Sequence, residues 1–239
     1  MEHSSVVFGG TARNVSNYIK SVLNHIETCG KLFKQFHVVI YENNSSDNTV
    51  RILEAEKKSN YKYIYESTNE TRRTVRLANG RNKILKEVLA LNPDYFVMLD
   101  LDDINSSGRF VQSIKSCFNV KEDWAALTGN QHGHYYDIWA LRMKGIMEED
   151  CWKKADSLRG IARNQYIDHF KSMTISGDDL LPVDSAFGGI ALYKTSALQN
   201  CLYEGAYPDG SEICEHVLFH AAIRQGGGNI YINPLFFTN

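Results

Sequence analysis

Hydrophobic and polar positions alternate between strand-like and helix-like patterns along the first half of the chain. Short apolar runs are typical of buried strands, whereas apolar residues that recur every three or four positions indicate helices. The predicted strands are residues 5–8, 36–41, 61–65 and 95–99. The predicted helices are residues 15–26, a short one through Ile52 and Leu53, and 77–91. Strands that alternate with helices predict an α/β fold with a mostly parallel central sheet flanked by helices.

The second half of the chain has a less regular pattern. No internal repeat or linker rich in Pro, Gly or Ser separates it from the first half, so we predict a single domain. Its expected elements are a strand at 124–128, a charged helix at 151–171 without an obvious buried face, a strand or hairpin at 185–193, a helix at 212–224 and a short strand at 229–232.

Composition narrows the classes of function. The chain has 239 residues, 43% of them hydrophobic, which is enough for a substantial core. A net charge of -2 leaves no basic excess for binding nucleic acid. No apolar run approaches the roughly 18–20 residues that span a bilayer, and the N-terminus lacks a signal-peptide pattern, so we expect a soluble, cytoplasmic chain. Five scattered cysteines without a Cys-x-x-Cys pair suggest neither disulfides nor a zinc site.

Three carboxylates follow the apolar run at 95–99. Asp100, Asp102 and Asp103 fall within four positions, at the end of a predicted strand where open α/β sheets bind their ligands. Carboxylates gathered in this way repel one another, and oxygen ligands suit a hard cation such as Mg²⁺, Mn²⁺ or Ca²⁺. The alternative is a solvated polar cap on the strand, with Asp103 starting the next helix.

Several segments together resemble GT-A fold glycosyltransferases. The first strand, Gly-containing turn and helix are followed by the polar loop 41–49, Gly80-Arg81-Asn82 and the Asp-x-Asp segment 99–103. Segments 136–142, 182–189 and 214–217 are similar in order and spacing to the fungal capsule-associated mannosyltransferases and related microbial and viral glycosyltransferases. The resemblance covers residues 6–234 and implies one GT-A domain, with a nucleotide-binding half at about 1–103 and an acceptor-binding, catalytic half at about 104–239.

The resemblance implies transfer of a sugar from a UDP- or GDP-sugar to a hydroxyl of a glycan or glycoconjugate acceptor. Such an enzyme neutralises the leaving diphosphate with Mn²⁺ or Mg²⁺. The implied metal residues are Asp100, Asp102, Asp103 and His216, and which carboxylates touch the ion is open. Glu215 is the implied catalytic base, with Asp184 as second choice; in a retaining enzyme, which needs no such base, Glu215 would bind acceptor instead.

Further residues are implied to contact the substrates, and each has a structural alternative. Arg81 could form a salt bridge with Glu87 or Asp94 instead, Trp139 could be a core residue, and the two adjacent glycines could form a bulge. The implied donor-binding residues are Arg13, Glu42, Asn44, Arg81, Asn82, Asp100, Gly188 and Gly189. Those implied for the sugar and acceptor are Asp137, Trp139 and Arg142.

Two other functions are compatible with parts of the pattern. A haloacid-dehalogenase-like phosphatase uses Asp-x-Asp as nucleophile and acid, and Asp178 and Asp179 would then bind Mg²⁺. Its first motif normally opens the chain, whereas three strand–helix units precede Asp100 here. A non-catalytic sugar-binding domain would keep the aromatic and glycine positions but lose carboxylates, which are present. We also predict that residues 68–76 and 151–179 form a lid that orders when donor binds.

Overall fold

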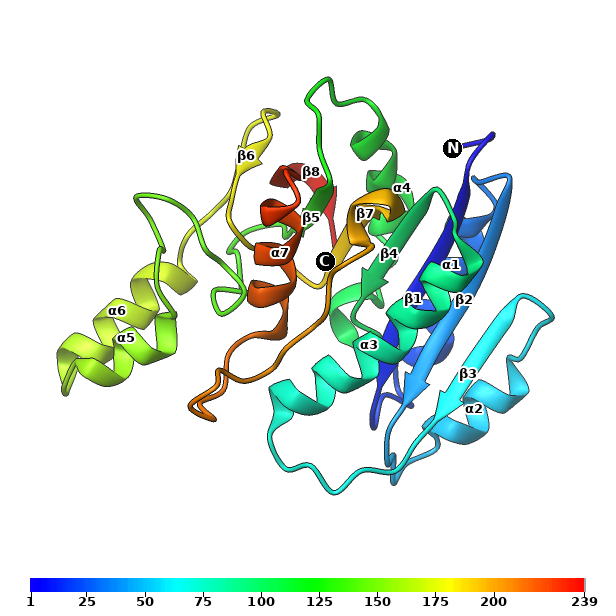
Figure 1. The fold of residues 1–239 in the computed structure, drawn as a ribbon, viewed down its shortest axis with the longest axis horizontal. Coiled ribbons are helices and arrows are strands. Elements are labelled where there is room, and N and C mark those ends of the chain that lie inside the picture. The colour runs from blue at the N-terminus through cyan, green and yellow to red at the C-terminus, as the bar shows by residue number, and fades with distance from the viewer. Residues whose placement is uncertain (239) are drawn as a thin grey trace.

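An eight-stranded sheet runs through the structure, a computed structural model that describes residues 1–238 (Figure 1). Its strand order is β3-β2-β1-β4-β7-β5-β8-β6. The strands are β1 (Ser5–Ala12), β2 (Gln35–Glu42), β3 (Tyr61–Tyr65), β4 (Tyr95–Leu99), β5 (Ala126–Asn130), β6 (Leu181–Pro182), β7 (Ile190–Lys194) and β8 (Ile230–Phe237). The first four strands are parallel to one another, whereas β7 runs antiparallel between β4 and β5. The predicted α/β fold with a mostly parallel sheet is confirmed.

Helices cover both faces of this sheet. Successive residues of β1 point to opposite faces, so Val6 and Phe8 pack in one core cluster and Val7 in the other. The first cluster contains the apolar side of α1, and the second contains residues of α3 and α7. The helices are α1 (Ile19–Gly30), α2 (Thr49–Ala55), α3 (Arg73–Leu91), α4 (Phe110–Ser113), α5 (Cys151–Ser157), α6 (Ile161–Lys171) and α7 (Glu215–Gln225), with short 3-10 turns η1 (Asp103–Asn105), η2 (Ile114–Phe118) and η3 (Thr195–Leu198).

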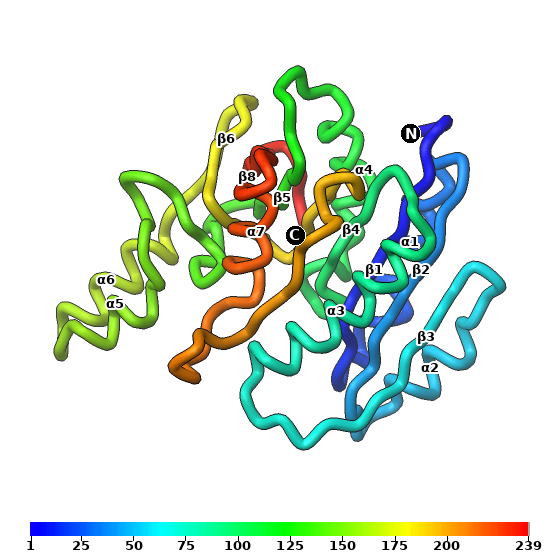
Figure 2. The backbone as a smooth tube through the Cα atoms, in the orientation of Figure 1, coloured from blue at the N-terminus to red at the C-terminus, as the bar shows by residue number. Residues whose placement is uncertain are grey.

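The helical pair α5 and α6 corrects one prediction. The expected single helix at 151–171 is divided at Gly160, whose φ of 57° lies in the left-handed region. The two short helices form a hairpin that projects from one side of the molecule (Figure 2). They do have a buried side, formed by Cys151, Ala155 and Ile167.

Other boundaries differ because contacts distant in sequence set them. β1 continues through Gly9 and Gly10 to Ala12 instead of turning at the glycines. A Cβ atom on Gly10 would lie 2.7 Å from the carbonyl oxygen of Leu99. The absence of a side chain here therefore allows β1 to pack closely against Leu99 and Leu101. Helix α3 begins four residues before the predicted start, at Arg73. Within residues 1–238, no helix is both long and apolar enough to span a membrane.

Candidate active site

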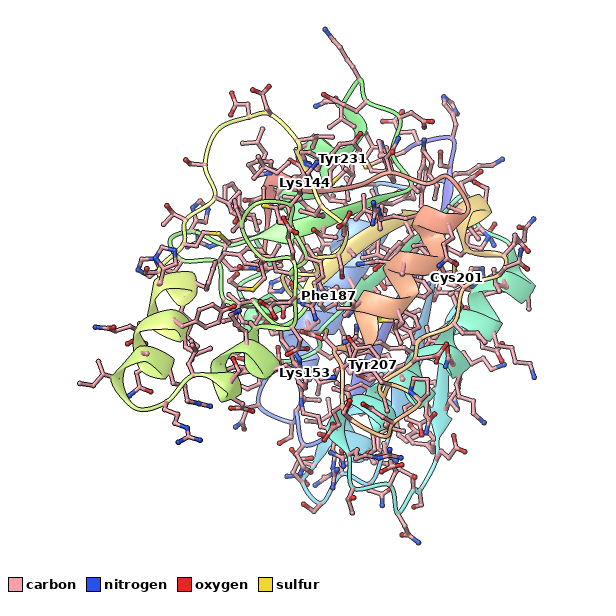
Figure 3. All side chains as sticks on the ribbon, turned by 60° about the vertical axis from the view of Figure 1, so that its left-hand side comes forward. Lys144, Lys153, Phe187, Cys201, Tyr207 and Tyr231 are labelled. Carbon is pink, nitrogen blue, oxygen red and sulfur yellow. The ribbon has the colours of Figure 1, made fainter. Side chains whose placement is uncertain are left out.

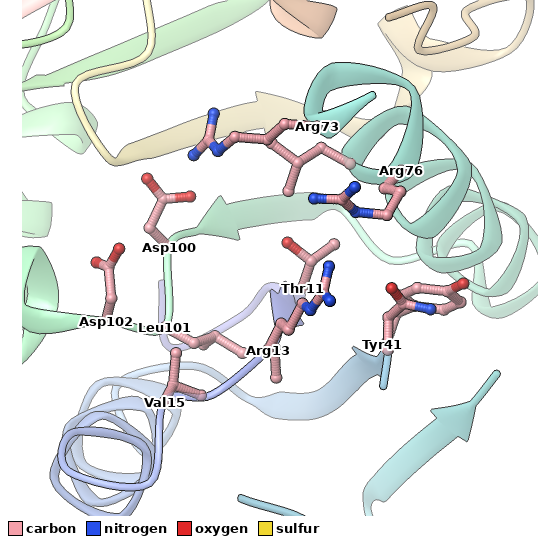
Figure 4. A pocket seen from close by; sticks show the side chains of 12 residues that line it. Thr11, Arg13, Val15, Tyr41, Arg73, Arg76, Asp100, Leu101 and Asp102 are labelled. Atoms are coloured by element: carbon pink, nitrogen blue, oxygen red, sulfur yellow. The ribbon is translucent and has the colours of Figure 1, made fainter. Parts of the chain in front are cut away.

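A pocket of about 240 Å³ opens at the carboxyl ends of β1, β2 and β4 (Figure 4). Open parallel sheets bind their ligands at this edge. The sheet supplies the floor, the segment after β4 supplies carboxylates, and the first turns of α3 supply one wall. The lining residues are Thr11, Ala12, Arg13, Val15, Tyr41, Asn43, Arg73, Arg76, Leu77, Asp100, Leu101 and Asp102.

Charged groups of both signs face this pocket. Arg13, Arg73 and Arg76 come from two different segments, and Figure 4 shows them across from Asp100 and Asp102. No carboxylate of residues 1–238 lies within ion-pair distance of any of these three guanidinium groups. Guanidinium groups bind phosphate oxygens with paired hydrogen bonds, and carboxylates bind divalent cations, so the pocket is suited to a phosphorylated ligand with a metal ion.

A buried ion-pair network lies next to the pocket and is centred on Arg81 of α3. Its Nη2 donates to Asp100 Oδ1 at 3.2 Å, and its Nε lies 3.3 Å from Glu215 Oε1. The guanidinium also packs 4.8 Å from the centre of the Phe187 ring and contacts His216 Nε2. The side chains of Arg81 and Glu215 are each only 4% exposed. The rival pairing of Arg81 with Glu87 or Asp94 is therefore wrong.

Burial determines the protonation tendencies in this network. Loss of solvent raises the pKa of Asp100 to about 7, although Arg81 acts in the opposite direction. Burial also raises the pKa of Asp102 and Asp137. It lowers the pKa of His216 well below its usual value, and the positive charge of Arg81 adds to this effect, so His216 is a neutral ring. Around Arg81 itself, the carboxyl groups of Asp100, Asp137 and Glu215 outnumber the single guanidinium group, which contributes to the raised pKa of Asp100.

The three aspartates differ in their surroundings. Asp100 and Asp102 line the pocket, whereas Asp103 is exposed and begins η1. Asp102 Oδ1 accepts a hydrogen bond from the Ile104 N–H at 3.3 Å, which caps the same turn. Among residues 1–238, no group of three or more His, Cys, Asp or Glu side chains is arranged to hold a metal ion. A cation here would have few protein ligands and would take its remaining ligands from substrate and water.

His216 has surroundings that do not support its predicted role as a metal ligand. It is 1% exposed, stacks on Phe187 at 3.8 Å between ring centres, and turns Nε2 toward the cationic Arg81. Four residues along α7, His220 is also buried, and its two ring nitrogens lie 3.0 Å from Ser185 Oγ and 2.9 Å from Tyr193 Oη. These histidines therefore fix α7 against the sheet.

The structure gathers two further predicted residues around Arg81. Glu215 is the first residue of α7, and the partly buried carboxylate of Asp137 accepts the Gly188 N–H at 3.1 Å. The Asp137 and Glu215 charges both act on Asp100, raising its pKa. Asp184 is elsewhere: its carboxylate lies 2.6 Å from Arg224 Nη1 and is half-exposed. Of the two predicted acids, only Glu215 adjoins the network.

Gly188 and Gly189 support the carboxyl end of β4. Both have positive φ angles, 64° and 82°, and a Cβ atom on Gly188 would lie 2.4 Å from the Gly129 carbonyl oxygen. The carbonyl oxygen of Gly189 accepts hydrogen bonds from the Asp100 N–H and from Asn105 Nδ2, each at 2.9 Å. In the structure, the backbone of these two glycines packs closely against other protein segments, and the Gly189 carbonyl helps to hold Asp100 in place.

Four other predicted residues use their side chains within the protein. Trp139 Nε1 and Arg142 Nη2 donate to the same Asp150 oxygen, at 3.0 and 3.2 Å, and thereby fix the start of α5. Asn82 exchanges two hydrogen bonds of 2.8 Å with the backbone of Tyr203. Glu42 accepts the Ser45 N–H at 2.7 Å. Their predicted contacts with substrates stay predictions.

Asn44 also organises a loop beside the pocket. It has a positive φ of 52°, and its side-chain oxygen accepts hydrogen bonds from Asn43 Nδ2 and the Thr68 N–H. Asn43 itself lines the pocket and was missed from the sequence, as were Tyr41, Arg73 and Arg76. The basic run at 72–76 was the only available signal for the two arginines, because the apolar periodicity of α3 begins after it.

Comparisons with known proteins bear on the fold and its class. Residues 10–116 match the family model described as glycosyl transferase family 2. Among solved structures, residues 1–349 of S. aureus TarS are 13% identical, with a TM-score of 0.52 over 95% of this chain and 57% of that chain. The mannosyltransferase PcManGT from Pyrobaculum calidifontis is 14% identical, with a TM-score of 0.54 over 97% of this chain and 55% of that chain. The chain has the GT-A fold.

The family match covers less than half of the chain, and the overall fold is that of GT-A glycosyltransferases, as the sequence predicted. This chain spans little more than half the length of those solved structures. No curated protein sequence gives a significant match. TarS 1–349 has also been solved with UDP-GlcNAc, and PcManGT with GDP-Man and Mn²⁺. Neither the match of residues 10–116 nor the GT-A fold supports the phosphatase alternative.

Proposed function

We propose that this GT-A domain transfers a sugar from a nucleoside diphosphate sugar, UDP- or GDP-linked, to a hydroxyl of a glycan or glycoconjugate. The observation that carries the proposal is the pocket at the carboxyl ends of β1, β2 and β4. There, three arginines that form no salt bridge with any carboxylate of residues 1–238 face Asp100 and Asp102. An anionic diphosphate with a divalent cation satisfies both sets of charges. The UDP-sugar and GDP-sugar in two structures of the same fold support this donor class.

The residues of the pocket fit a divalent metal ion, Mn²⁺ or Mg²⁺. Asp102 is the primary candidate ligand, because its partly buried carboxylate lines the pocket and, within residues 1–238, accepts a single hydrogen bond from another residue. Asp100 and the exposed Asp103 flank it. Both ions accept a small number of carboxylates together with phosphate oxygens. When bound, the ion supplies positive charge to the departing diphosphate.

The residues around Arg81 have the chemistry for the acceptor step. In an inverting reaction, the acceptor oxygen attacks the anomeric carbon, the bond from that carbon to the phosphate oxygen breaks, and Glu215 takes the hydroxyl proton. Arg81 supplies the positive charge that Glu215 and Asp100 need inside the protein. In a retaining reaction, Glu215 would instead accept a hydrogen bond from the acceptor. In both mechanisms, Asp137 would accept hydrogen bonds from hydroxyl groups of the sugar or the acceptor.

Release of nucleoside diphosphate from UDP- and GDP-sugars tests the proposal. The assay compares wild type, Glu215→Gln and the matched control Asp184→Asn with Mn²⁺ and a panel of glycan acceptors. Loss of a general base lowers rates by about 100-fold or more, so Glu215→Gln should be strongly impaired. Asp184→Asn should retain wild-type turnover within about twofold, as expected for a half-exposed surface pair.

Two results would contradict parts of the proposal. A Glu215→Gln variant as active as wild type would remove Glu215 from the catalytic step while leaving the donor site intact. Absence of release from every UDP- and GDP-sugar, with any acceptor in the panel, would contradict the proposed donor class.

A further inference from the structure

We propose that Glu212 is a positioning residue of the donor pocket: it holds the first turn of α3 so that Arg73 and Arg76 face the diphosphate. This inference rests on the proposed function, because it assigns the two arginines to the phosphates of the donor. Glu212 itself lies outside the pocket, in the segment 201–214 that precedes α7. It precedes Glu215, the first residue of α7, by three positions.

The contact between Glu212 and α3 is direct. Glu212 Oε2 accepts hydrogen bonds from the Thr74 N–H at 3.2 Å and from Thr74 Oγ1 at 2.7 Å. Arg72, at the N-cap position, provides no side-chain hydrogen bond of its own to this helix end. The first N–H groups of a helix lack partners within the helix, and a negative charge at this end is favourable. Glu212, 138 positions from Thr74, therefore accepts the hydrogen bond from the helix N-terminus that a local N-cap side chain usually accepts.

Thr74 lies between the two arginines that line the pocket. It follows Arg73 directly and precedes Arg76 by two positions, so the orientation of this turn sets where both guanidinium groups point. Arg76 Nη1 also donates to the carbonyl oxygens of Glu70 and Thr71, at 3.0 and 2.6 Å, which ties it to the segment before the helix. A shift of the first turn would therefore move the wall of the pocket that carries positive charge.

The segment around Glu212 has little freedom to adapt. The carbonyl oxygen of Gly205 lies 2.6 Å from Thr74 Oγ1, and a Cβ atom on Gly205 would lie 2.2 Å from the backbone carbon of Thr74. Ala206 and Glu212 form an isolated β-bridge, and Ile213 N–H donates to the Gly205 oxygen at 3.2 Å. Backbone packs directly on backbone here, so Glu212 is fixed relative to α3.

The same segment also contacts the α5–α6 hairpin. Lys153 of α5 donates to Ser211 Oγ at 3.0 Å and lies 4.0 Å from the centre of the Tyr207 ring, a pairing visible in Figure 3. The segment 201–214 thus joins α3, α5 and the start of α7. Its contacts therefore help to fix the position of Arg73 and Arg76 relative to Glu215.

The negative charge of Glu212 also acts on neighbouring arginines. The hydrogen bonds from Thr74 lower the pKa of Glu212, and the charges of Arg72 and Arg76 lower it further. Its carboxylate is therefore ionised at neutral pH and attracts Arg76 electrostatically. Glutamine at this position would keep an oxygen that accepts from Thr74 but would lose this attraction.

Binding of UDP and GDP with Mn²⁺, measured by isothermal titration calorimetry, tests the inference without requiring an acceptor. Loss of one such contact corresponds to about a two- to tenfold weaker affinity for Glu212→Ala. Glu212→Gln should show a smaller loss, and Glu204→Ala, which removes an exposed acid of the same segment, should bind like wild type. If Glu212→Ala does not fold, Thr74→Val removes the same hydroxyl contact and should also weaken binding.

Combination with Arg76→Ala separates positioning from general damage. If Glu212 acts through the arginines, Glu212→Ala should cost at most half as much affinity, on a logarithmic scale, in the Arg76→Ala background as in wild type. An equal loss in both backgrounds, or wild-type affinity of Glu212→Ala and Thr74→Val, would overturn the inference. A wild-type protein that binds neither nucleotide would contradict the proposed function itself and the inference with it.

Discussion

Replacement of Arg81 by methionine should destabilise the fold far more than replacement of a neighbouring surface lysine. Methionine keeps much of the length and the apolar stem of arginine but removes the charge. In the structure, Arg81 pairs with Glu215 at 3.3 Å and with Asp100 at 3.2 Å, and the side chains of these acids are only 4% and 28% exposed. Without Arg81, Glu215 would remain buried with no counter-charge, and the pKa of Asp100, already about 7, would rise further.

The size of the effect follows from this burial. Removal of one partner from a buried ion pair typically costs about 3–5 kcal/mol, because the remaining charge stays buried. Domains are usually stable by about 5–15 kcal/mol, so Arg81→Met should lose a large share of the total. The matched control is Lys83→Met on the same helix, where Lys83 pairs with Glu66 at 3.6 Å and both side chains are about half-exposed. Such a pair contributes about 0–1 kcal/mol.

Urea unfolding followed by far-ultraviolet circular dichroism at pH 7.5 measures both variants. A double variant, Arg81→Met with Glu215→Gln, should recover at least about 1 kcal/mol relative to Arg81→Met, since one of the unpaired charges is removed. If Arg81→Met loses no more stability than Lys83→Met, the account of a buried network centred on Arg81 is wrong.

Two further predictions concern buried groups outside the pocket. Burial, and to a smaller extent the charge of Arg81, lowers the pKa of His220 to about 3, against about 6.5 in an unfolded chain. The neutral ring therefore contributes its full share to the free energy of unfolding above pH 6.5, and this share is lost as the pH falls from 6.5 toward 3. At pH 5 the loss amounts to about 2 kcal/mol, and the urea midpoints of His220→Gln should lack this part of the pH dependence. Plots of urea midpoint against pH that run parallel for wild type and His220→Gln would refute the prediction. Gly205→Ala should lower stability by about 1–3 kcal/mol in the same assay because its Cβ atom would meet the Thr74 backbone, whereas Gly226→Ala, whose nearest contact is 3.3 Å, should change it much less.

Much of the first half of the fold could be predicted from the sequence because its apolar runs are short, distinct and separated by helical patterns. β3 and β4 have the predicted limits, and β4 delivers Asp100 to the sheet edge as expected. The start of α3 could not be predicted in this way. Its first turn has no apolar periodicity and is stabilised by Glu212, which is 138 positions away in sequence.

Residue types indicated the chemistry of the site better than they indicated each contact. Arg81 and Glu215 were predicted separately, but their pairing depends on how α3 and α7 pack, which local patterns do not contain. Trp139 and Arg142 have side chains common in sugar sites, yet both donate to Asp150 in the protein interior. The same functional groups satisfy buried partners or bind ligands, and only the three-dimensional arrangement distinguishes these roles.

The most direct test of the donor site is thermal unfolding with UDP or GDP, with and without Mn²⁺, on wild type and Asp102→Asn. Asparagine keeps an oxygen for the Ile104 N–H but removes the charge that a metal ion needs. A ligand at one hundred times its dissociation constant stabilises the native state by about 2.7 kcal/mol, which gives a clear rise in unfolding temperature. The account predicts a rise for at least one nucleotide that requires Mn²⁺ and is lost in Asp102→Asn. Unfolding temperatures that no nucleotide changes, or an equal rise in Asp102→Asn, would contradict it.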